Sequence, residues 1–150
     1  MNPVRIGVIG VGHLGQHHAR LLAGLEGVEL AGIVDINASR AQEIAGKFGA
    51  RTFATTSELV GQVDAVTIAT PTVTHIDIAM PFVEAGVAVL IEKPLAAGME
   101  EADRLLEAAA RRGTIVATGH TERFNPAVAV ALPLVTNPRF VEIHRLGTFP

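Results

Sequence analysis

Three glycines at a fixed spacing are the residues of this 150-residue chain with the clearest ligand chemistry. Gly10, Gly12 and Gly15 follow the pattern G-x-G-x-x-G, with His13 and Leu14 in its second gap. The first glycine of this pattern makes a tight turn, the second lets the backbone approach a pyrophosphate, and the third lets a helix pack closely on a strand. The N–H groups at such a helix start attract anions. These five residues are therefore predicted to bind the pyrophosphate of a dinucleotide.

An acidic residue follows the glycines at the distance that dinucleotide sites require. Asp35 lies roughly 20 residues after Gly15, at the end of the next apolar run. Its carboxylate can accept hydrogen bonds from the adenosine ribose and repels a 2′-phosphate, which favours NAD over NADP. Arg40 follows five residues on and could meet a 2′-phosphate instead. An aspartate that only caps a turn is the alternative interpretation.

The elements that position these residues are predicted from hydrophobic periodicity. Residues 4–9 are almost wholly apolar, as in a parallel strand buried on both faces, and residues 28–34 form the next strand. The helix between them is expected to bury one face, formed by Leu14, His18, Leu21, Leu22 and Leu25. A strand, a helix, a strand and an acid within about 30 residues fit one βαβ unit.

The same alternation continues along the chain. Further strands are predicted at 51–53, 65–69, 87–91 and 115–118. Further helices are predicted from 37 or 39 to 48, from 56 or 57 to about 60, from 75 to a stop at Gly86, and over 99–112. Parallel neighbours need crossover connections, so the pattern predicts an α/β fold, a doubly wound parallel sheet of the Rossmann type with strand order 3-2-1-4-5-6. Residues 1–120 are assigned to this domain.

Two more polar loops follow strand ends and are expected in the same crevice. Thr70 and Pro71 are predicted to shape the wall beside the nicotinamide, and His75 to cap the following helix or contact the cofactor. Glu92 and Lys93 follow the fifth strand and are also predicted to contact the cofactor. The carboxyl ends of parallel strands meet at one edge of a sheet, which brings these loops together.

Lys93 is the candidate acid/base group. A carbinol releases a hydride only when its O–H proton is also removed, and a lysine amine can take that proton. Pro94 restricts Lys93 to an extended backbone and permits a cis peptide bond between them. A surface Glu–Lys pair before a proline that ends a strand is the alternative.

Composition excludes several classes of function. Twelve Lys and Arg against fifteen Asp and Glu give a net charge of −3, without a basic field for nucleic acid, and there is no Trp or Tyr to stack on bases. There is no cysteine, no apolar run of membrane-spanning length and no leader pattern at the start, so a soluble cytoplasmic protein is expected. His13 and His17 have the spacing of a zinc helix but lack its glutamate base, so no metal is expected.

The chain changes character after Gly119. Residues 120–126 are polar, residues 127–132 are predicted to form a short helix, and residues 140–146 alternate like a strand with one solvent-exposed face. Six strands already complete the parallel sheet. Residues 121–150 are therefore interpreted as a connection and the first strand of a second α/β domain.

The motifs together resemble those of the glucose–fructose oxidoreductase, inositol dehydrogenase and rhizopine catabolism (Gfo/Idh/MocA) oxidoreductases. The resemblance covers essentially the whole chain, and its most specific part is Glu92-Lys93-Pro94; it also includes the glycine turn, Asp35, 69–71 with His75, 85–86, 119–120 and 123–126. It implies an NAD(P)-dependent oxidoreductase of sugars, cyclitols or sugar nucleotides and favours a catalytic role for Lys93. It also implies a homo-oligomer at full length, and a second domain that supplies most substrate contacts and an Asp/His motif. The 150 residues alone are then expected to be inactive.

The leading hypothesis is the NAD-binding part of an oxidoreductase that transfers a hydride between a secondary hydroxyl and nicotinamide. By similarity, residues 119–126 weakly favour a nucleotide sugar such as a UDP-N-acetylhexosamine. The alternative is a stand-alone NAD(H)-binding or sensing module without catalysis. A coding frame that continues past Pro150 for about a domain's length would favour the enzyme, and a stop codon there the module. A scaffold that binds no ligand is a third possibility, indicated by the absence of any stabilisation by NAD.

Overall fold

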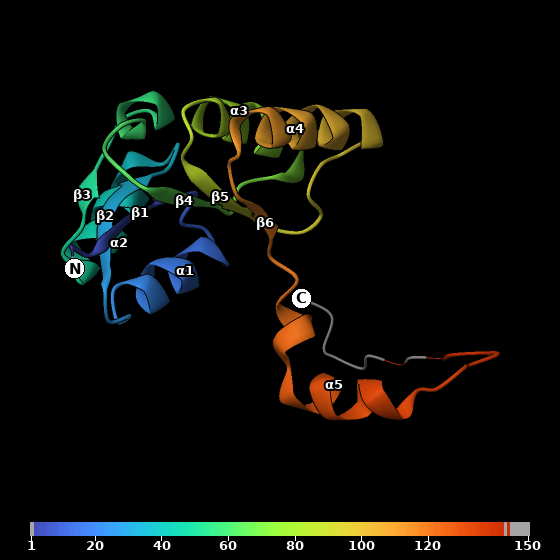
Figure 1. The fold of residues 1–150 in the computed structure, drawn as a ribbon. Helices are drawn as coiled ribbons and strands as arrows, with labels where there is room; N and C mark the ends of the chain where they lie inside the picture. The colour runs from blue at the N-terminus through green and yellow to red at the C-terminus, as the bar shows by residue number, and fades with distance from the viewer. Residues whose placement is uncertain (1, 143, 145–150) are drawn as a thin grey trace. The chain divides into compact units, whose positions relative to one another are not determined.

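The computed structural model of the chain describes residues 2–142 and 144. Its strands are β1 (Val4–Ile9), β2 (Val28–Val34), β3 (Arg51–Thr52), β4 (Ala65–Ile68), β5 (Ala88–Ile91) and β6 (Val116–Thr118). All the pairings between them are parallel, in the order β3-β2-β1-β4-β5-β6 (Figure 1). The predicted fold class and strand order are confirmed.

Helices follow the strands at the predicted places. They are α1 (Gly15–Leu22), α2 (Ala38–Phe48), α3 (His75–Glu84), α4 (Met99–Arg112) and α5 (Pro126–Ala131), with 3-10 turns at Thr56–Leu59, Thr72–Thr74, Thr121–Phe124 and Leu132–Leu134. Helix α2 begins where the Asn37 side chain accepts the Arg40 N–H, and it ends at Gly49 in the left-handed conformation. No helix in the described residues is both long and apolar enough to cross a membrane.

The helices cover the sheet in two pairs. Helices α1 and α2 contact each other beside β1 and β2, and α3 packs on α4 on the opposite face (Figure 1). Each pair of helices packs on the sheet around a separate apolar core, so the sheet lies between two hydrophobic clusters. This is the layered arrangement that right-handed βαβ crossovers produce.

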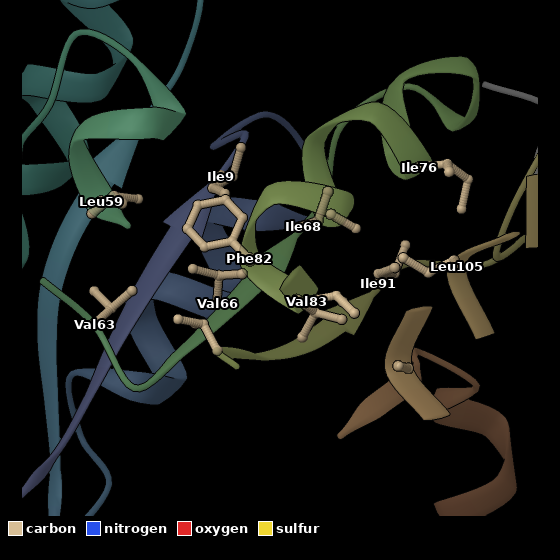
Figure 2. Packing of buried hydrophobic residues seen from close by; sticks show 14 of the residues in the cluster. Ile9, Leu59, Val63, Val66, Ile68, Ile76, Phe82, Val83, Ile91 and Leu105 are labelled. Atoms are coloured by element: carbon tan, nitrogen blue, oxygen red, sulfur yellow. The ribbon is translucent and has the colours of Figure 1, made fainter. Parts of the chain in front are cut away.

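The larger core lies between α3, α4 and the sheet. Phe82 of α3 is fully buried, and its ring lies close to Ile9 and Val66 from two neighbouring strands (Figure 2). Burying a phenylalanine side chain of this kind contributes roughly 2–3 kcal/mol to folding. The core therefore packs α3 against β1, whose carboxyl end leads into the glycine turn, and against β4.

The expected buried face of α1 is only partly correct, because His18 and Leu22 are partly buried and Leu22 packs against the core. Leu14, Leu21 and Leu25 are about half exposed, whereas the buried residues of the helix are Gly15 and Ala19. Close approach to the sheet selects the small side chains, because leucines on that face would hold the helix away from β1. The periodicity of the leucines therefore indicated a helix but misplaced part of its inner face.

The chain divides into two compact units, Met1–Gly119 and His120–Pro150. The second unit contains α5, which begins where the Asn125 side chain accepts the Ala127 N–H. The strand predicted at 140–146 is not present at 140–142 or at 144, and its remaining residues lie outside the described part of the chain.

Candidate functional site

The glycine turn is compressed between β4 and α1. Gly10 has a φ of +81°, and a Cβ there would lie 2.7 Å from the carbonyl oxygen of Ala69. A Cβ at Gly15 would overlap the carbonyl oxygen of Gly10. The fold itself therefore requires glycine at both positions, because a side chain would displace backbone.

Gly12 is different, because a Cβ there would meet no protein atom within 4 Å. In the described part of the chain, the backbone N–H groups of Gly12, His13 and Leu14 donate to no protein acceptor. They lie at the start of α1, where the helix dipole is positive. An open backbone with free donors fits a pyrophosphate, the group that the sequence predicts here.

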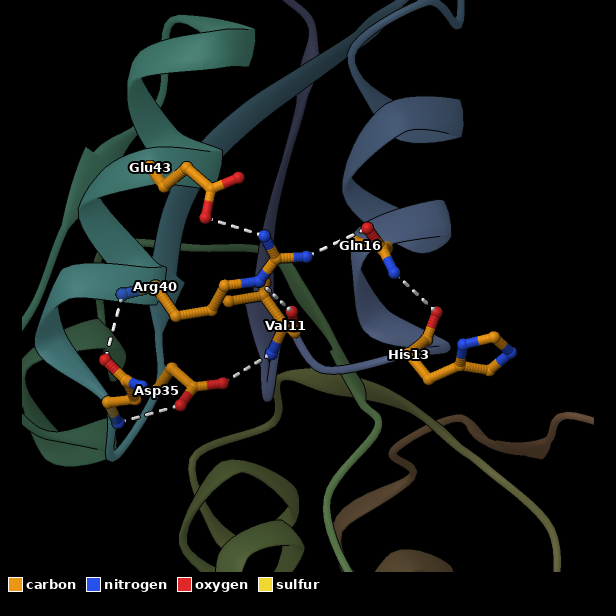
Figure 3. A network of polar contacts seen from close by, with 7 residues as sticks. Val11, His13, Gln16, Asp35, Arg40 and Glu43 are labelled. Carbon is orange, nitrogen blue, oxygen red and sulfur yellow. Dashed lines mark hydrogen bonds and ion pairs between the residues drawn. The ribbon is translucent and has the colours of Figure 1, made fainter. Parts of the chain in front are cut away.

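Asp35 holds this turn from the side. Its carboxylate accepts the N–H of Val11 at 2.7 Å and the N–H of Asn37 at 2.8 Å (Figure 3). It is only partly buried, so its oxygens can accept further hydrogen bonds. The acid thus fixes the peptide between Gly10 and Gly12 and stands at the end of β2.

One pocket brings several predicted residues together. It has a volume of about 330 Å³ and is lined by Ile9, Gly10, Gly12, Val34, Asp35, Ile36, Thr56, Ala69, Thr70, Pro71, Thr74 and Ile78. Gly10, Gly12, Asp35, Thr70 and Pro71 were all predicted to contact the cofactor, and they come from three separate loops. The pocket is large enough for part of a dinucleotide.

The buried ring of His75 connects the loop after β4 to the loop after β5. The residue is 1% exposed, its Nε2 lies 2.9 Å from the carbonyl oxygen of Thr70, and its Nδ1 lies 3.0 Å from that of Pro94. A neutral ring donates to one of these oxygens and a protonated ring to both. The prediction that His75 caps α3 is wrong, because its ring meets carbonyl oxygens and not the helix's N–H groups. Direct contact with the cofactor stays a prediction.

Glu92 is buried in a second polar cluster. It is 6% exposed, and its Oε1 lies 3.1 Å from Nε2 of His18 in α1. The other nitrogen of His18 lies 2.5 Å from the hydroxyl oxygen of Thr67 in β4. Gly119 closes the cluster, since a Cβ there would lie 2.9 Å from Oε1 of Glu92. The three side chains tie α1 to β4 and to the end of β5.

Lys93 is exposed and follows this cluster directly. Its backbone N–H donates to Oε2 of Glu92 at 3.2 Å, and its peptide bond to Pro94 is cis. Within residues 2–142 and 144, no hydrogen bond or ion pair joins its ammonium to another side chain. The surface Glu–Lys pair considered from the sequence is absent, because the Glu92 carboxylate turns inward to His18.

Sequence reasoning missed the contacts of His18 with Thr67 and Glu92, and those of Arg40 with its three acceptors. From the sequence, His18 belongs to an apolar helix face and Thr67 to a buried strand. A signal existed in each case: His18 interrupts the small residues on the inner face of α1, and Thr67 is the one polar residue of β4. Their convergence on Glu92 depends on the strand order and could not be found from spacing.

A family model matches most of the chain. The model described as "Oxidoreductase family, NAD-binding Rossmann fold" (Gfo/Idh/MocA) matches residues 4–120. The UDP-N-acetylglucosamine 3-dehydrogenase of Acidithiobacillus ferrooxidans is 44% identical over 147 residues, which are 97% of this chain and 46% of the relative. Inositol 2-dehydrogenase 3 of Saccharopolyspora erythraea is 40% identical over 126 residues, 81% of this chain and 37% of that protein. The chain thus spans less than half the length of these relatives.

Solved structures give the same result. The Acidithiobacillus ferrooxidans enzyme superposes with a TM-score of 0.83 at 44% identity, over 90% of this chain and 44% of that one. GenD2 from gentamicin A biosynthesis, solved in complex with NAD, superposes with a TM-score of 0.87 at 33% identity, over 91% and 40% of the two chains. This chain belongs to the Gfo/Idh/MocA oxidoreductase family and contains its NAD-binding Rossmann domain.

Proposed function

We propose that this chain is the NAD-binding part of a dehydrogenase that oxidises a secondary hydroxyl, and that it selects NAD over NADP. The observation that carries the proposal is the joint placement of Gly12 and Asp35 on one pocket. Gly12 and the two residues after it offer free N–H groups to a pyrophosphate, and Asp35 offers carboxylate oxygens to ribose hydroxyls. The NAD complex of GenD2, a relative of the same fold, supports this choice of cofactor.

When bound, NAD supplies the hydride acceptor, and the protein must remove the hydroxyl proton. We propose that Lys93 accepts this proton. The amine nitrogen of Lys93 takes the O–H proton while the C–H hydride leaves with its electron pair, so the carbinol becomes a carbonyl. Two features support this role: the Lys93 side chain is exposed and meets no partner side chain in the described residues, and the buried Glu92 accepts the Lys93 backbone N–H.

The substrate class is proposed from the relatives. Two of them are a UDP-N-acetylglucosamine 3-dehydrogenase and an inositol 2-dehydrogenase, so a sugar, cyclitol or sugar nucleotide is expected, with a nucleotide sugar favoured by the greater identity. These relatives are more than twice as long as the matched segment. Most substrate contacts are therefore expected from residues outside this chain.

Cofactor preference is tested by thermal unfolding of the 150-residue chain with NAD⁺ and with NADP⁺. Ligand at about 100 times its Kd stabilises the folded state by roughly 2.7 kcal/mol, which raises Tm by roughly 5–10 °C. NAD⁺ is expected to give this shift and NADP⁺ a much smaller one at equal concentration. Equal shifts would contradict the preference, and no shift with either would contradict cofactor binding.

The role of Lys93 is tested in the protein at its natural length. Lys93→Met is expected to lower kcat by about 10²- to 10⁴-fold, because the proton acceptor is lost. NAD⁺ affinity, measured by calorimetry, should change far less. Lys47→Met, on the exposed side of α2, is the matched control and should leave kcat unchanged. A kcat of Lys93→Met near that of the wild type would exclude the assignment.

A further inference from the structure

Arg40 is the residue of this site that a 2′-phosphate could use. It lies in the first turns of α2, five residues after Asp35, and an arginine near that acid is the usual partner of the 2′-phosphate in NADP-binding folds. Asp35 accepts the N–H of Val11 at 2.7 Å, and Arg40 donates from Nε to the carbonyl oxygen of the same Val11 at 3.1 Å (Figure 3). The acid and the base therefore hold one residue of the glycine turn from its two sides.

The rest of the guanidinium is also bound to protein. Nη1 donates to Oε2 of Glu43 at 2.7 Å, and Nη2 donates to Oε1 of Gln16 at 2.8 Å (Figure 3). Gln16 is itself oriented, because its amide nitrogen donates to the carbonyl oxygen of His13 at 3.2 Å. A guanidinium has five N–H donors, and three of them are committed in three directions.

We propose that Glu43 contributes to cofactor specificity by holding Arg40 against protein, together with Gln16, so that discrimination against NADP depends on Glu43 as well as on Asp35. This inference rests on the proposed binding of NAD. Both acids add negative charge where a 2′-phosphate would approach, and Glu43 also occupies the Nη1 face of the only arginine that contacts the turn in the described residues. Loss of the Asp35 charge alone leaves Arg40 directed at protein acceptors.

Glu43 has the larger part in this arrangement because it carries the charge. Its side chain is 62% exposed and that of Arg40 is 27% exposed, so the pair is partly screened by solvent. If the 2′-phosphate takes the place of Glu43 beside Arg40, we expect the affinity for NADP⁺ to change by about fivefold. Removal of the negative charge of Asp35 from beside the phosphate is expected to change it by about tenfold or more. Glu43 is therefore a modifier of specificity, and its effect is expected to appear in full only when Asp35 is neutral.

The experiment measures Kd for NAD⁺ and NADP⁺ by calorimetry on the 150-residue chain. The variants are Glu43→Gln, Asp35→Asn, the double variant, and the double variant with Arg40→Ala. Asp35→Asn keeps an oxygen that can accept the Val11 N–H, and Glu107→Gln on the exposed face of α4 is the control for the lost charge. The wild type is expected to bind NAD⁺ more tightly than NADP⁺.

Glu43→Gln is expected to tighten NADP⁺ binding about fivefold and to leave NAD⁺ within about twofold. The gain of the double variant for NADP⁺ should exceed the product of the two single gains, because Nη1 of Arg40, released from Glu43, can then donate to the phosphate. Adding Arg40→Ala should cancel that excess.

Three results would overturn the inference while NAD⁺ preference still holds: no difference between Glu43→Gln and Glu107→Gln, independent effects in the double variant, or an excess that survives Arg40→Ala. A wild type that binds both cofactors equally would instead overturn the proposed NAD preference, and the inference with it.

Discussion

The two halves of the site hold their loops by different means. In the first half, after β1 and β2, backbone groups are exposed where glycines leave space. Charged side chains at the edge of the turn, such as Asp35, hydrogen-bond to its backbone. In the second half, after β4 and β5, the loops are held by hydrogen bonds of His75 and Glu92, two side chains that are almost completely buried. One half therefore offers the backbone itself to a ligand, and the other uses buried side chains as supports.

Because of this difference, a substitution can change ligand affinity without changing the free energy of unfolding only in the first half of the site. A side chain added at Gly12, on the open surface of the first half, meets no protein atom within 4 Å, so it is expected to affect the proposed ligand and not the fold. In the second half, each polar atom that shapes the loops is also a partner of a buried group, so its loss costs folding free energy as well. Mutations in the two halves are therefore expected to have different signatures.

The largest effect is expected for a pair of glycine variants within the first half. Gly15→Ala should cost roughly 3 kcal/mol or more of unfolding free energy, because its Cβ overlaps the Gly10 carbonyl oxygen. Gly12→Ala should leave stability within about 0.5 kcal/mol, since no protein atom is near and its φ is not positive. Its NAD⁺ affinity should nevertheless fall at least tenfold, or about 1.4 kcal/mol, because the methyl occupies space next to the free N–H groups.

Urea unfolding and calorimetry on the same preparations measure both quantities. A Gly12→Ala variant that loses stability and affinity together would break the proposed separation. A Gly12→Ala variant with wild-type NAD⁺ affinity would show that the pyrophosphate does not bind at this part of the turn.

His75→Leu tests the second half. The substitution leaves the carbonyl oxygens of Thr70 and Pro94 without their ring partner and should lower the free energy of unfolding by roughly 2–3 kcal/mol. His17→Leu, on the exposed side of α1, is the control and should change it by less than about 0.5 kcal/mol. Equal stability of the two variants in urea unfolding would mean that the second half does not depend on its buried histidine.

The same difference explains how much could be predicted from the sequence. The first half depends on local requirements, so the pattern of Gly10, Gly12 and Gly15 with Asp35 predicted both the turn and the acid beside it. The alternation of elements predicted the parallel sheet, and the strand order chosen for it, the one typical of dinucleotide-binding folds, is confirmed. Part of the inner face of α1 was misplaced, because periodicity does not reveal that Gly15 and Ala19 must approach the sheet.

The supports of the second half could not be predicted, because they are long-range contacts. Thr67, Glu92 and His18 come from three elements that only the folded sheet brings together. Likewise, the Pro94 carbonyl oxygen that meets His75 lies in another loop. Single-residue patterns identified Glu92 and His75 as polar residues at strand ends but gave no indication that their side chains turn inward.

The smallest effect is expected at the opposite edge of the sheet, where neither half of the site depends on the contact. Arg5 donates from its backbone N–H and from its guanidinium to Asp64, with the shortest distance 2.7 Å. The side-chain hydrogen bond from Arg5, and then the backbone one, hold the pKa of Asp64 below its usual value. Because the pKa is lower in the folded state, the pair stabilises the fold above the ordinary carboxyl pKa of about 3.9 and ceases to do so as the pH falls through the lower folded pKa.

Asp64→Asn is therefore expected to be slightly less stable than the wild type near pH 7, and the two unfolding curves should converge at acidic pH. Urea unfolding between neutral pH and pH 3 measures this difference. NAD⁺ affinity should be the same in both proteins, because the pair lies at the amino ends of β1 and β4 and the glycine turn at the carboxyl end of β1. A gap in stability that widens toward low pH would reverse the sign of the linkage, and a change in NAD⁺ affinity would show that the core transmits changes at this edge to the first half of the site.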